Sequence, residues 1–539
     1  MRKIIALCCL LGVLLLSACG PTGQPTSTTT TDTTTTDTTI MTDDTSWSDT
    51  DWSDDFQEPV ISDWYDDDYT SDDDYSPAIE YVEVLPDVDD YALATPQTGG
   101  SDAEAAVLRE EILNTKDQLG EITGVTYYVS AEHGNDNNDG LSPETAWQTC
   151  DALVINSYMI QSGDAILFER GGVYRRTSPI EVVSGVTYAA YGEGYKPRIY
   201  GSSTNYAWGT QWEPSRRQYV WKINLYSREA GMLVFNHGEA FGIPKYFGLN
   251  ELQQNGDFYH NVDESILYLY LDKGYPNVVY EDIEIGTREN VFTIPDYTEN
   301  VTFDNLCVKY AGLFTFDVQT ATDGLRFTNL EIGWVGGCRY GDTAYGLGNG
   351  IQFWGDTYNA LVENCWIYQI YDTGITPQGV TTEHTYKNLV FRKNLIEYCN
   401  YSIEVFDHKT SSKWDGLVIE DNIMRFAGYG WLSPRPDRSY SVSHYNGWTY
   451  LYDELPGDGI TICNNIFDCS IQNLVYWTGT DYGTKGLTIS GNSFYQKANA
   501  QNKALAFGTA GQQYATNQAE LEAAVAIMDP NPKTVKWLS

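Results

Sequence analysis

A short pattern of alternating apolar and polar residues recurs around an asparagine in the second half of the chain. The motifs are Phe303-Asp304-Asn305-Leu306, Phe327-Thr328-Asn329-Leu330, Val362-Glu363-Asn364-Cys365, Arg392-Lys393-Asn394-Leu395, Glu420-Asp421-Asn422-Ile423, Cys463-Asn464-Asn465-Ile466 and Ser490-Gly491-Asn492-Ser493. Successive asparagines are 24, 35, 30, 28, 43 and 27 residues apart. A period in the twenties with insertions is typical of a solenoid, whose repeats bury their apolar faces only against each other. We therefore predict stacked coils with an asparagine ladder at one bend.

A second set of strand-like segments lies between these motifs. They are Gly350-Ile351-Gln352-Phe353-Trp354, Gly374-Ile375-Thr376-Pro377-Gln378, Ser402-Ile403-Glu404-Val405-Phe406, Gly430-Trp431-Leu432-Ser433-Pro434 and Asn473-Leu474-Val475-Tyr476-Trp477. Side chains alternate across a strand, so Ile351, Ile375, Ile403, Trp431 and Leu474 are expected to point inward. The next positions, Gln352, Thr376, Glu404, Leu432 and Val475, then point outward, as do Trp354, Gln378, Phe406, Pro434 and Trp477.

The outward positions form a strip of aromatic, amide and carboxylate side chains. Flat aromatic faces beside polar groups suit pyranose rings, which have an apolar face and hydroxyl edges. The sequence therefore predicts a polysaccharide-binding strip, although an ordinary solvated face has the same alternation. The predicted substrate-binding residues are Trp354, Gln352, Gln378, Phe406 and Trp477 on the strands, with His408, Arg435 and Arg438 from adjoining loops.

Glu404 is the strongest candidate for acid–base or nucleophilic chemistry, because it is a charged residue in the middle of an apolar strand. Glycoside hydrolysis needs two carboxyl groups on either side of the scissile bond. The partner of Glu404 is left open between Asp407, Asp372 and Asp356. Each of these also suits a turn, where Asp is common.

Two other functions remain open. A polysaccharide lyase would abstract a proton from a uronate, with His408, Lys409, Arg435 or Arg438 as base and calcium as a candidate cofactor. From Val125 to Ser539 there are 47 acidic and 28 basic residues, and this negative charge disfavours a lyase because it repels a polyuronate. A non-catalytic glycan-binding or adhesive surface protein is the third option. The sequence predicts no metal site and leaves the cofactor otherwise unknown.

The charge and the N-terminal region set the expected location. With 74 Asp and Glu against 32 Lys and Arg, the chain lacks the basic surface that nucleic-acid binding requires. Residues 20–100 contain 21 acidic residues and no Lys or Arg, and are rich in Thr, which predicts a disordered tether. Arg2 and Lys3 precede a short apolar run that ends in Leu16-Ser17-Ala18-Cys19. This run resembles the lipobox of bacterial lipoproteins, which implies lipidation of Cys19 and anchoring on the extracellular face of the membrane. We expect a monomer.

The residues after Tyr127 carry a second resemblance. Tyr127-Tyr128-Val129-Ser130, the Asn/Asp-rich segment 134–140, Ala146-Trp147, Gly163-Asp164-Ala165-Ile166-Leu167-Phe168 and Gly171-Gly172-Val173-Tyr174 resemble the opening of right-handed parallel β-helix proteins of the pectate-lyase-like group, which act on polysaccharides. The resemblance covers about residues 125–494. It implies an all-β solenoid closed by a helix at its start, and no catalytic signature can be carried over from it.

The expected organisation follows from these observations. We predict a signal peptide over residues 1–19, a linker over 20–100, a capping helix within 101–124, the β-helix over 125–500 and a C-terminal cap over 501–539. Ser101 is the expected N-cap of the first helix, over 101–115, and Asn517 caps a helix over 515–528. Residues 208–271 read as early coils or an insertion. The seven cysteines after Cys19 have no metal-ligand spacing and are expected to be buried packing residues, with room for one disulfide.

Overall fold

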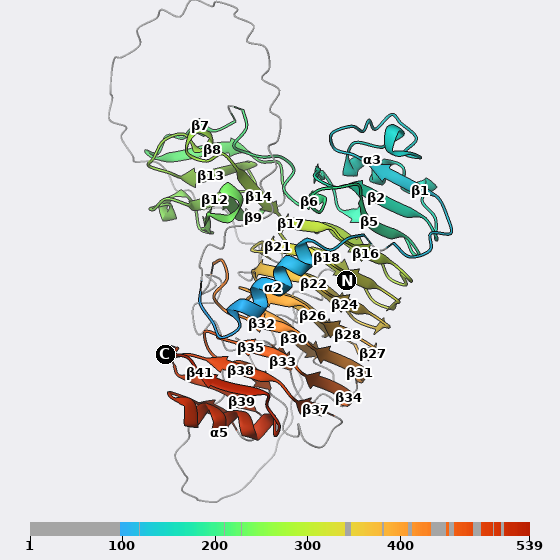
Figure 1. Ribbon diagram of the computed structural model, residues 1–539. Helices are drawn as coiled ribbons and strands as arrows, with labels where there is room; N and C mark the ends of the chain where they lie inside the picture. The colour runs from blue at the N-terminus through green and yellow to red at the C-terminus, as the bar shows by residue number, and fades with distance from the viewer. Residues whose placement is uncertain are drawn as a thin grey trace, which may run out of the picture. The chain divides into compact units, whose positions relative to one another are not determined.

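In the computed structural model, the chain winds into a β-helix whose stacked coils form three long, mostly parallel sheets (Figure 1). The structure describes residues 97–117, 119–209, 211–227, 229–339, 346–379, 382–407, 412–432, 449–451, 457–477, 487–499, 501–507 and 511–539. The predicted signal peptide, Cys19 and almost all of the acidic tether lie outside these residues. Parallel strands joined by crossovers take a right-handed path, and the predicted fold class, a right-handed parallel β-helix, is confirmed.

The first sheet, sheet A, begins with the first strand of the described chain and contributes one strand to nearly every coil. Its members are β1 (Thr126–Val129), β2 (Ala165–Glu169), β5 (Thr187–Tyr191), β16 (Thr302–Asp304), β20 (Arg326–Thr328), β24 (Leu361–Glu363), β28 (Val390–Arg392), β31 (Lys413–Glu420), β34 (Gly457–Cys463) and β37 (Leu487–Ser490). The long strand β31 also pairs with a side row of β27 (Thr385–Lys387), β23 (Thr357–Tyr358) and β19 (Thr322–Asp323).

Sheets B and C complete each coil. Sheet B contains β3 (Val173–Arg175), β6 (Arg198–Tyr200), β17 (Cys307–Ala311), β21 (Glu331–Val335), β25 (Trp366–Ile370), β29 (Leu395–Glu397), β32 (Ile423–Arg425), β35 (Ile466–Asp468), β38 (Ser493–Gln496) and β41 (Thr534–Trp537). Sheet C contains β4 (Ile180–Glu181), β15 (Phe292–Ile294), β18 (Phe316–Val318), β22 (Ile351–Trp354), β26 (Thr373–Gly379), β30 (Tyr401–Asp407), β33 (Thr449–Leu451), β36 (Val475–Trp477), β39 (Lys503–Phe507) and the antiparallel β40 (Gly511–Tyr514).

The core between the sheets is built from side chains that repeat from coil to coil. Phe292 stacks on Phe316 with ring centroids 5.1 Å apart, and Phe303 stacks on Phe327 at 5.3 Å. Parallel in-register strands place the same position of each coil above the last, so one apolar residue per coil becomes a continuous column. The alternation of apolar and polar residues in the sequence thus follows from the stacking of the coils.

The asparagine ladder is present, but it uses two positions instead of one. In the early coils Asn305, Asn329 and Asn364 themselves adopt positive φ at the bend, with φ of 60°, 55° and 56°. In the later coils the preceding residue takes that conformation, and the asparagine after it is buried. These later residues form a hydrogen-bonded column of Asn394, Asn422, Asn465, Asn492 and finally Asp529. The asparagine of each early motif therefore aligns with the residue that precedes the asparagine in the late motifs.

An antiparallel insertion separates β6 from β15. It contains β7 (Glu213–Pro214), β8 (Val220–Asn224), β9 (Ala230–Phe235), η4 (Asn236–Gly238), β10 (Ala240–Phe241), β11 (Ile243–Pro244), η5 (Leu249–Glu251), β12 (Asp257–Asn261), β13 (Ile266–Tyr270), α4 (Pro276–Val279) and β14 (Ile283–Thr287). Met232 and Val234 of β9 pack in one apolar cluster with Trp334 and Trp431 of the coils. The region around 208–271 is an insertion rather than a set of coils.

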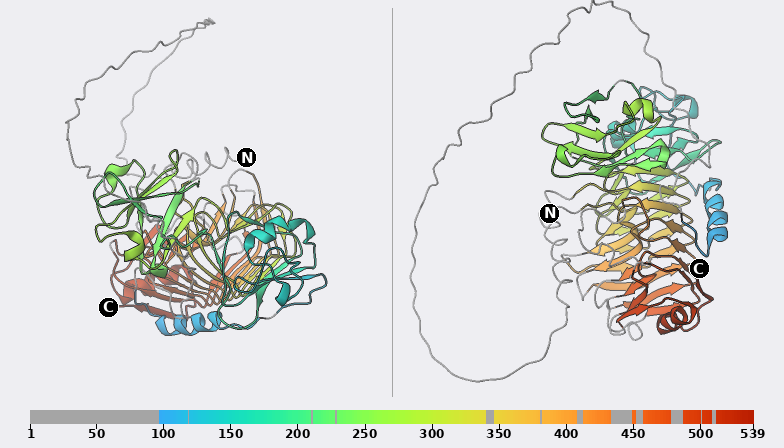
Figure 2. Two further views of the ribbon diagram at one scale, coloured as in Figure 1. Left: turned by 90° about the horizontal axis from the view of Figure 1, so that it is seen from above. Right: turned by 90° about the vertical axis from the view of Figure 1, so that its left-hand side faces the viewer.

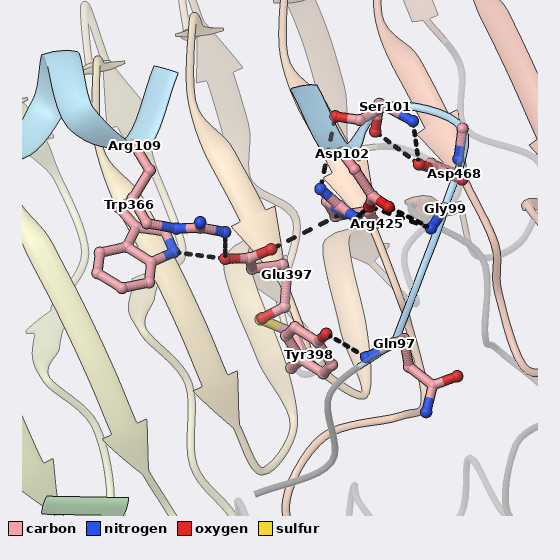
Figure 3. Close-up of polar contacts among 12 residues, drawn as sticks. Gln97, Gly99, Ser101, Asp102, Arg109, Trp366, Glu397, Tyr398, Arg425 and Asp468 are labelled. Atoms are coloured by element: carbon pink, nitrogen blue, oxygen red, sulfur yellow. Dashed lines mark hydrogen bonds and ion pairs between the residues drawn. The ribbon is translucent and has the colours of Figure 1, made fainter. Parts of the chain in front are cut away.

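The first described helix, α2 (Asp102–Leu113), runs along the flank of the stack rather than across its end (Figure 2). The predicted N-cap Ser101 makes no side-chain cap bond. Its hydroxyl instead donates to Asp468 Oδ2 at 2.6 Å, and the neighbouring Asp102 pairs with Arg425 of β32 (Figure 3). The helix thus covers the outer face of sheet B, where its partners Asp468 and Arg425 lie. We call residues 97–117 the strap.

Other helices lie near the two ends of the core. α3 (Cys150–Ile155) contributes Cys150 and Leu153 to the core beside β1 and β2, and is flanked by η2 (Pro143–Thr145) and η3 (Ser157–Met159). α5 (Gln518–Met528) contributes Leu521 and Val525, and the Asn517 side chain accepts the Glu520 N–H, which confirms that predicted cap.

The cysteines after Cys19 behave as packing residues. Cys150, Cys307, Cys338, Cys365, Cys399 and Cys469 are buried and Cys463 is half-buried, and all seven are free thiols. None of the helices in the described ranges has the length and apolar character needed to cross a bilayer.

Candidate functional site

The outer face of sheet C carries the predicted strip over three adjacent strands. Ile351 of β22, Ile375 of β26 and Ile403 of β30 are in register and buried in the core. On the alternate positions Gln352 aligns with Thr376, and Trp354 aligns with Gln378 and then with Phe406. The predicted register is therefore confirmed for these coils, which place Gln352, Gln378, Trp354 and Phe406 side by side.

The register of the last two predicted strands is different. β33, which begins at Thr449, pairs with β30, whereas Trp431 and Leu432 are buried in a cluster with Trp334 and Tyr371. In β36 the backbone of Trp477 aligns with Leu451 and Phe507, which continue the Val405 position rather than that of Phe406. Val475 is in the core. The expected outward positions of Leu432 and Val475 are thus wrong, because a long segment precedes β33 and shifts the register, whereas the side chain of Trp477 lies outside the described part of the structure.

The strip holds a network of amides that extends beyond the predicted residues to Asp317 of β18. Asp317 aligns with Gln352. Gln352 Nε2 donates to Asp317 Oδ1 at 3.1 Å, and Asn290 Nδ2 donates to Oδ2 at 2.8 Å. Gln352 Oε1 in turn accepts from Gln378 Nε2 at 2.7 Å and from Asn349 Nδ2 at 2.9 Å. A hydrogen bond to a neighbouring coil fixes the orientation of each of these amides.

Burial shifts the acidity of Asp317. It raises the pKa of this carboxyl to about 6, although hydrogen bonds from Gln352, Asn290 and Gln319 act in the opposite direction. A carboxyl with such a pKa holds a proton at mildly acid pH and can give it up near neutrality, which is the property of a general acid.

Glu404 is half-buried in the same column, on the strand β30. Its Oε2 accepts from Thr373 Oγ1 at 3.2 Å and from Thr376 Oγ1 at 3.5 Å. Both threonines belong to β26, so the carboxylate leans back toward the preceding coil. The backbone N–H of Thr373 donates to Asn349 Oδ1 at 3.0 Å. Through Asn349 and Gln352, an unbroken chain of hydrogen bonds therefore joins Glu404 to Asp317.

The three proposed partners of Glu404 lie elsewhere. Asp407 is buried on the inward side of β30, where Tyr386 Oη donates to its Oδ2 at 3.3 Å. Asp356 lies in the turn between β22 and β23, and its Oδ1 accepts the Thr385 N–H at 2.6 Å. Asp372 directly precedes β26, and its N–H donates to the Gly348 carbonyl at 3.0 Å. Strand alternation separates Asp407 from Glu404, and Asp356 is held as a turn former. Of the three, only Asp372 lies at the edge of the outer face.

Some predicted residues lie outside the described residues. They are His408, Lys409, Arg435 and Arg438, together with the lipidation candidate Cys19. Within the part of the chain that the structure describes, no three His, Cys, Asp or Glu side chains gather as metal ligands would.

Asp317 is the functional candidate that sequence reasoning missed. Thr315-Phe316-Asp317-Val318 repeats the pattern of Ser402-Ile403-Glu404-Val405: a small polar residue, an apolar residue, an acid and a valine. An acid in the centre of an apolar strand was the signal that selected Glu404. The same signal selects Asp317 once β18 is aligned with β22.

Comparisons with known proteins give one short sequence match. No family model matches the chain. A stretch of 106 residues is 32% identical to a lacto-N-biosidase from Bifidobacterium longum subsp. longum, covering 18% of this chain and 6% of that protein. The chain therefore spans only a small part of this curated relative.

Several solved structures are similar over most of the chain. A glycoside hydrolase is 9% identical, covers 77% of this chain and 96% of its own, and has a TM-score of 0.41. A family GH136 lacto-N-biosidase from Eubacterium ramulus is 15% identical over 76% of this chain and 68% of its own, with a TM-score of 0.40. A pectate lyase is 12% identical over 72% and 78%, with a TM-score of 0.35.

Proposed function

We propose that this protein is a glycoside hydrolase that binds a polysaccharide or glycan along the outer face of sheet C. The observation that carries the proposal is the joined column of Glu404, Gln352 and Asp317, flanked by the aromatic side chains of Trp354 and Phe406. The short match to a lacto-N-biosidase supports this class of reaction.

The strip has the two kinds of group that a sugar requires. Trp354 and Phe406 are half-buried and offer flat apolar faces to the CH face of a pyranose. Gln378, which aligns between them, supplies an amide for a hydroxyl edge. Because Gln352 and Thr376 are held by neighbours and buried, the polar groups are already oriented before substrate arrives.

Replacing Glu404 by Gln tests the proposal. The variant keeps the size of the side chain and can still meet the Thr373 and Thr376 hydroxyls. We expect wild-type protein to release reducing ends from at least one member of a glycan panel, without new ultraviolet absorbance. Glu404→Gln should lower this rate by at least about 100-fold, the scale of a lost acid–base group, while still binding the same glycan on an affinity gel.

A matched control is Glu420→Gln on β31, which changes the same functional group on sheet A. It should keep wild-type activity. Products that absorb in the ultraviolet would identify a lyase instead, and retardation on the gel without any product would identify a glycan-binding protein. Either result, or full activity in Glu404→Gln, overturns the assignment.

We also propose that the protein is secreted, lipidated on Cys19 and held on the extracellular face of the bacterial membrane by the acidic tether. The apolar run ending in Leu16-Ser17-Ala18-Cys19 supports this location. Metabolic labelling with an alkyne fatty acid should mark the wild-type chain and Cys9→Ala, but not Cys19→Ala. The Cys19 variant should also leave the membrane fraction. Labelling of the Cys19 variant would contradict the proposal.

A further inference from the structure

Asp317 and Glu404 occupy the same outward column of sheet C. β18 pairs with β22, β22 with β26 and β26 with β30, so three coil steps separate the two residues. Neighbouring strands lie about 4.8 Å apart, which places the two Cα atoms about 14 Å from each other. Glu404 leans onto the coil of β26 through Thr373 and Thr376. Two coil steps, or about 10 Å, therefore remain between the carboxyl groups.

This separation suits one of the two geometries of glycoside hydrolysis. Retention requires carboxyls about 5 Å apart, whereas inversion leaves room for a water at roughly 6.5–9.5 Å. The Asp317–Glu404 spacing of about 10 Å is twice the retaining distance and lies just beyond the wide end of the second range. The groups between them, Gln352 and Thr376, are uncharged and are already engaged with these two carboxyls.

The surroundings of the two acids differ. Every hydrogen bond found at Asp317 comes from an uncharged amide, contributed by Asn290, Gln352 and Gln319. On the other side, β15 presents Thr293 in register, and the nearest acid of the column, Glu181, is two coils away and exposed. Glu289, next to Asn290, is paired with Arg176. Among the described residues no Lys, Arg or His forms an ion pair with Asp317. Glu404 accepts two hydrogen bonds from the hydroxyls of Thr373 and Thr376.

We infer that Asp317 is the general acid and Glu404 the general base of a single-displacement glycoside hydrolysis, an inference that rests on the proposed function. Gln352 donates to Asp317 Oδ1 and Asn290 to Oδ2, so neighbouring amides fix the orientation of this carboxyl in the column. The raised pKa of Asp317 agrees with this role.

The reaction balances as one hydrolysis. Water attacks the anomeric carbon and forms the new C–O bond, while Glu404 accepts a proton from that water. The bond from the anomeric carbon to the leaving oxygen breaks, and Asp317 gives its proton to that oxygen. The proton gained by Glu404 and the one lost by Asp317 then exchange with solvent, so both carboxyls return to their starting states.

A leaving-group comparison tests Asp317. The sugar that wild-type enzyme releases from the glycan panel is made into two aryl glycosides, one with 2,4-dinitrophenol and one with 4-methoxyphenol. A dinitrophenolate leaves without protonation, so Asp317→Asn should retain its hydrolysis within about 10-fold. The same variant should lose about 100-fold or more on the methoxyphenyl glycoside and on the glycan, the scale of a missing general acid.

The matched control is Asp323→Asn, in the same coil but on β19 of sheet A, where its carboxylate accepts from Asn359. This control should behave as wild type on both substrates. Equal losses on both aryl glycosides, or wild-type rates in Asp317→Asn, would overturn the role of Asp317 while leaving the proposed function intact. A wild-type protein that cleaves no glycan would instead overturn the proposed function itself.

Discussion

Arg109 on the strap and Glu397 on sheet B form an ion pair across 288 residues of sequence, with Nη2 2.5 Å from Oε1. Glu397 is 1% exposed and also accepts from Trp366 Nε1 at 2.9 Å (Figure 3). The guanidinium of Arg109 lies 5.0 Å from the centre of a ring of Trp366. The strap thus supplies, through Arg109, much of the positive charge that stabilises the buried Glu397 carboxylate.

Arg109→Ala should therefore destabilise the protein by about 3 kcal/mol, because it leaves a buried carboxylate short of a partner. The expected measurement is a lower midpoint in urea unfolding, accompanied by faster proteolysis of the strap. Glu110→Ala, at an exposed position on the same helix, should stay within about 0.5 kcal/mol of wild type. Equal effects in both variants would mean that the ion pair does not stabilise the strap.

Asn422→Ala should remove the centre of the buried ladder. The Asn422 side chain accepts from the backbone N–H and the amide of Asn394 and donates to Asn465 Oδ1. Its loss leaves buried donors and acceptors unpaired, at a cost of about 2 kcal/mol or more. Calorimetry or urea unfolding measures this, with exposed Asn224→Ala on β8 as the control. A neutral Asn422→Ala would show that water replaces the missing amide.

Asp317→Asn should stabilise the protein at pH 8 and leave it unchanged at pH 4. The native pKa of about 6 lies above the value near 3.9 of an unfolded Asp. Between these values the native state binds more protons, so stability falls as the pH rises from about 4 to about 6 and stays lower above it. Removing the charge should recover up to about 3 kcal/mol at pH 8. Unfolding curves at both pH values check this, and an equal effect at both contradicts it.

The product released by wild-type enzyme should carry the inverted anomeric configuration. This follows from the two-coil spacing between the Asp317 and Glu404 carboxyls, which admits a water but not a direct attack by Glu404. Proton NMR of the first product, recorded before mutarotation, reads the configuration directly. A retained anomer would mean that another, closer carboxyl pair does the chemistry.

The rate of wild-type hydrolysis should fall as the pH rises above about 6, because Asp317 then loses the proton it must donate. In Asp317→Asn acting on the dinitrophenyl glycoside, this decline should disappear. A pH series of kcat/KM on both proteins decides the point. The same alkaline decline in the variant would assign it to a different group.

The fold could be predicted from the sequence because each stacked coil repeats the same pattern of apolar and polar positions. Ile351, Ile375 and Ile403 fill one core column, and their spacing alone gave the register of three coils. The same reasoning failed at Val475, which lies in the core, because the strand between β30 and β36 begins only at Thr449 and no repeat marks it. It predicted the helix α2 but not its place on sheet B. Ala105 and Ile112 identify the buried face of that helix, but they do not specify which sheet covers it.

The candidate site was predicted in part. Glu404 and its aromatic and amide neighbours came from alternation along single strands, which is a local property. Asp317 required the pairing of β18 with β22, which lie 35 residues apart, and the pKa of its carboxyl is raised by burial in the folded chain. Asp407 was misassigned as a partner because proximity in sequence hides the fact that strand neighbours three apart face opposite sides.

The strap also sets an order of assembly. Ser101 meets Asp468 across 367 residues, and Gln97 meets Tyr398 across 301. A ribosome therefore releases the strap first, and the Asp468 partner of Ser101 only after most coils exist. Before that moment Asp117 can already meet Arg170 and Asn305 of the early coils, but the N-terminal end of the strap has no partner. Complete docking of the strap thus requires that β35 has formed, which makes it a late step in the assembly of the coils.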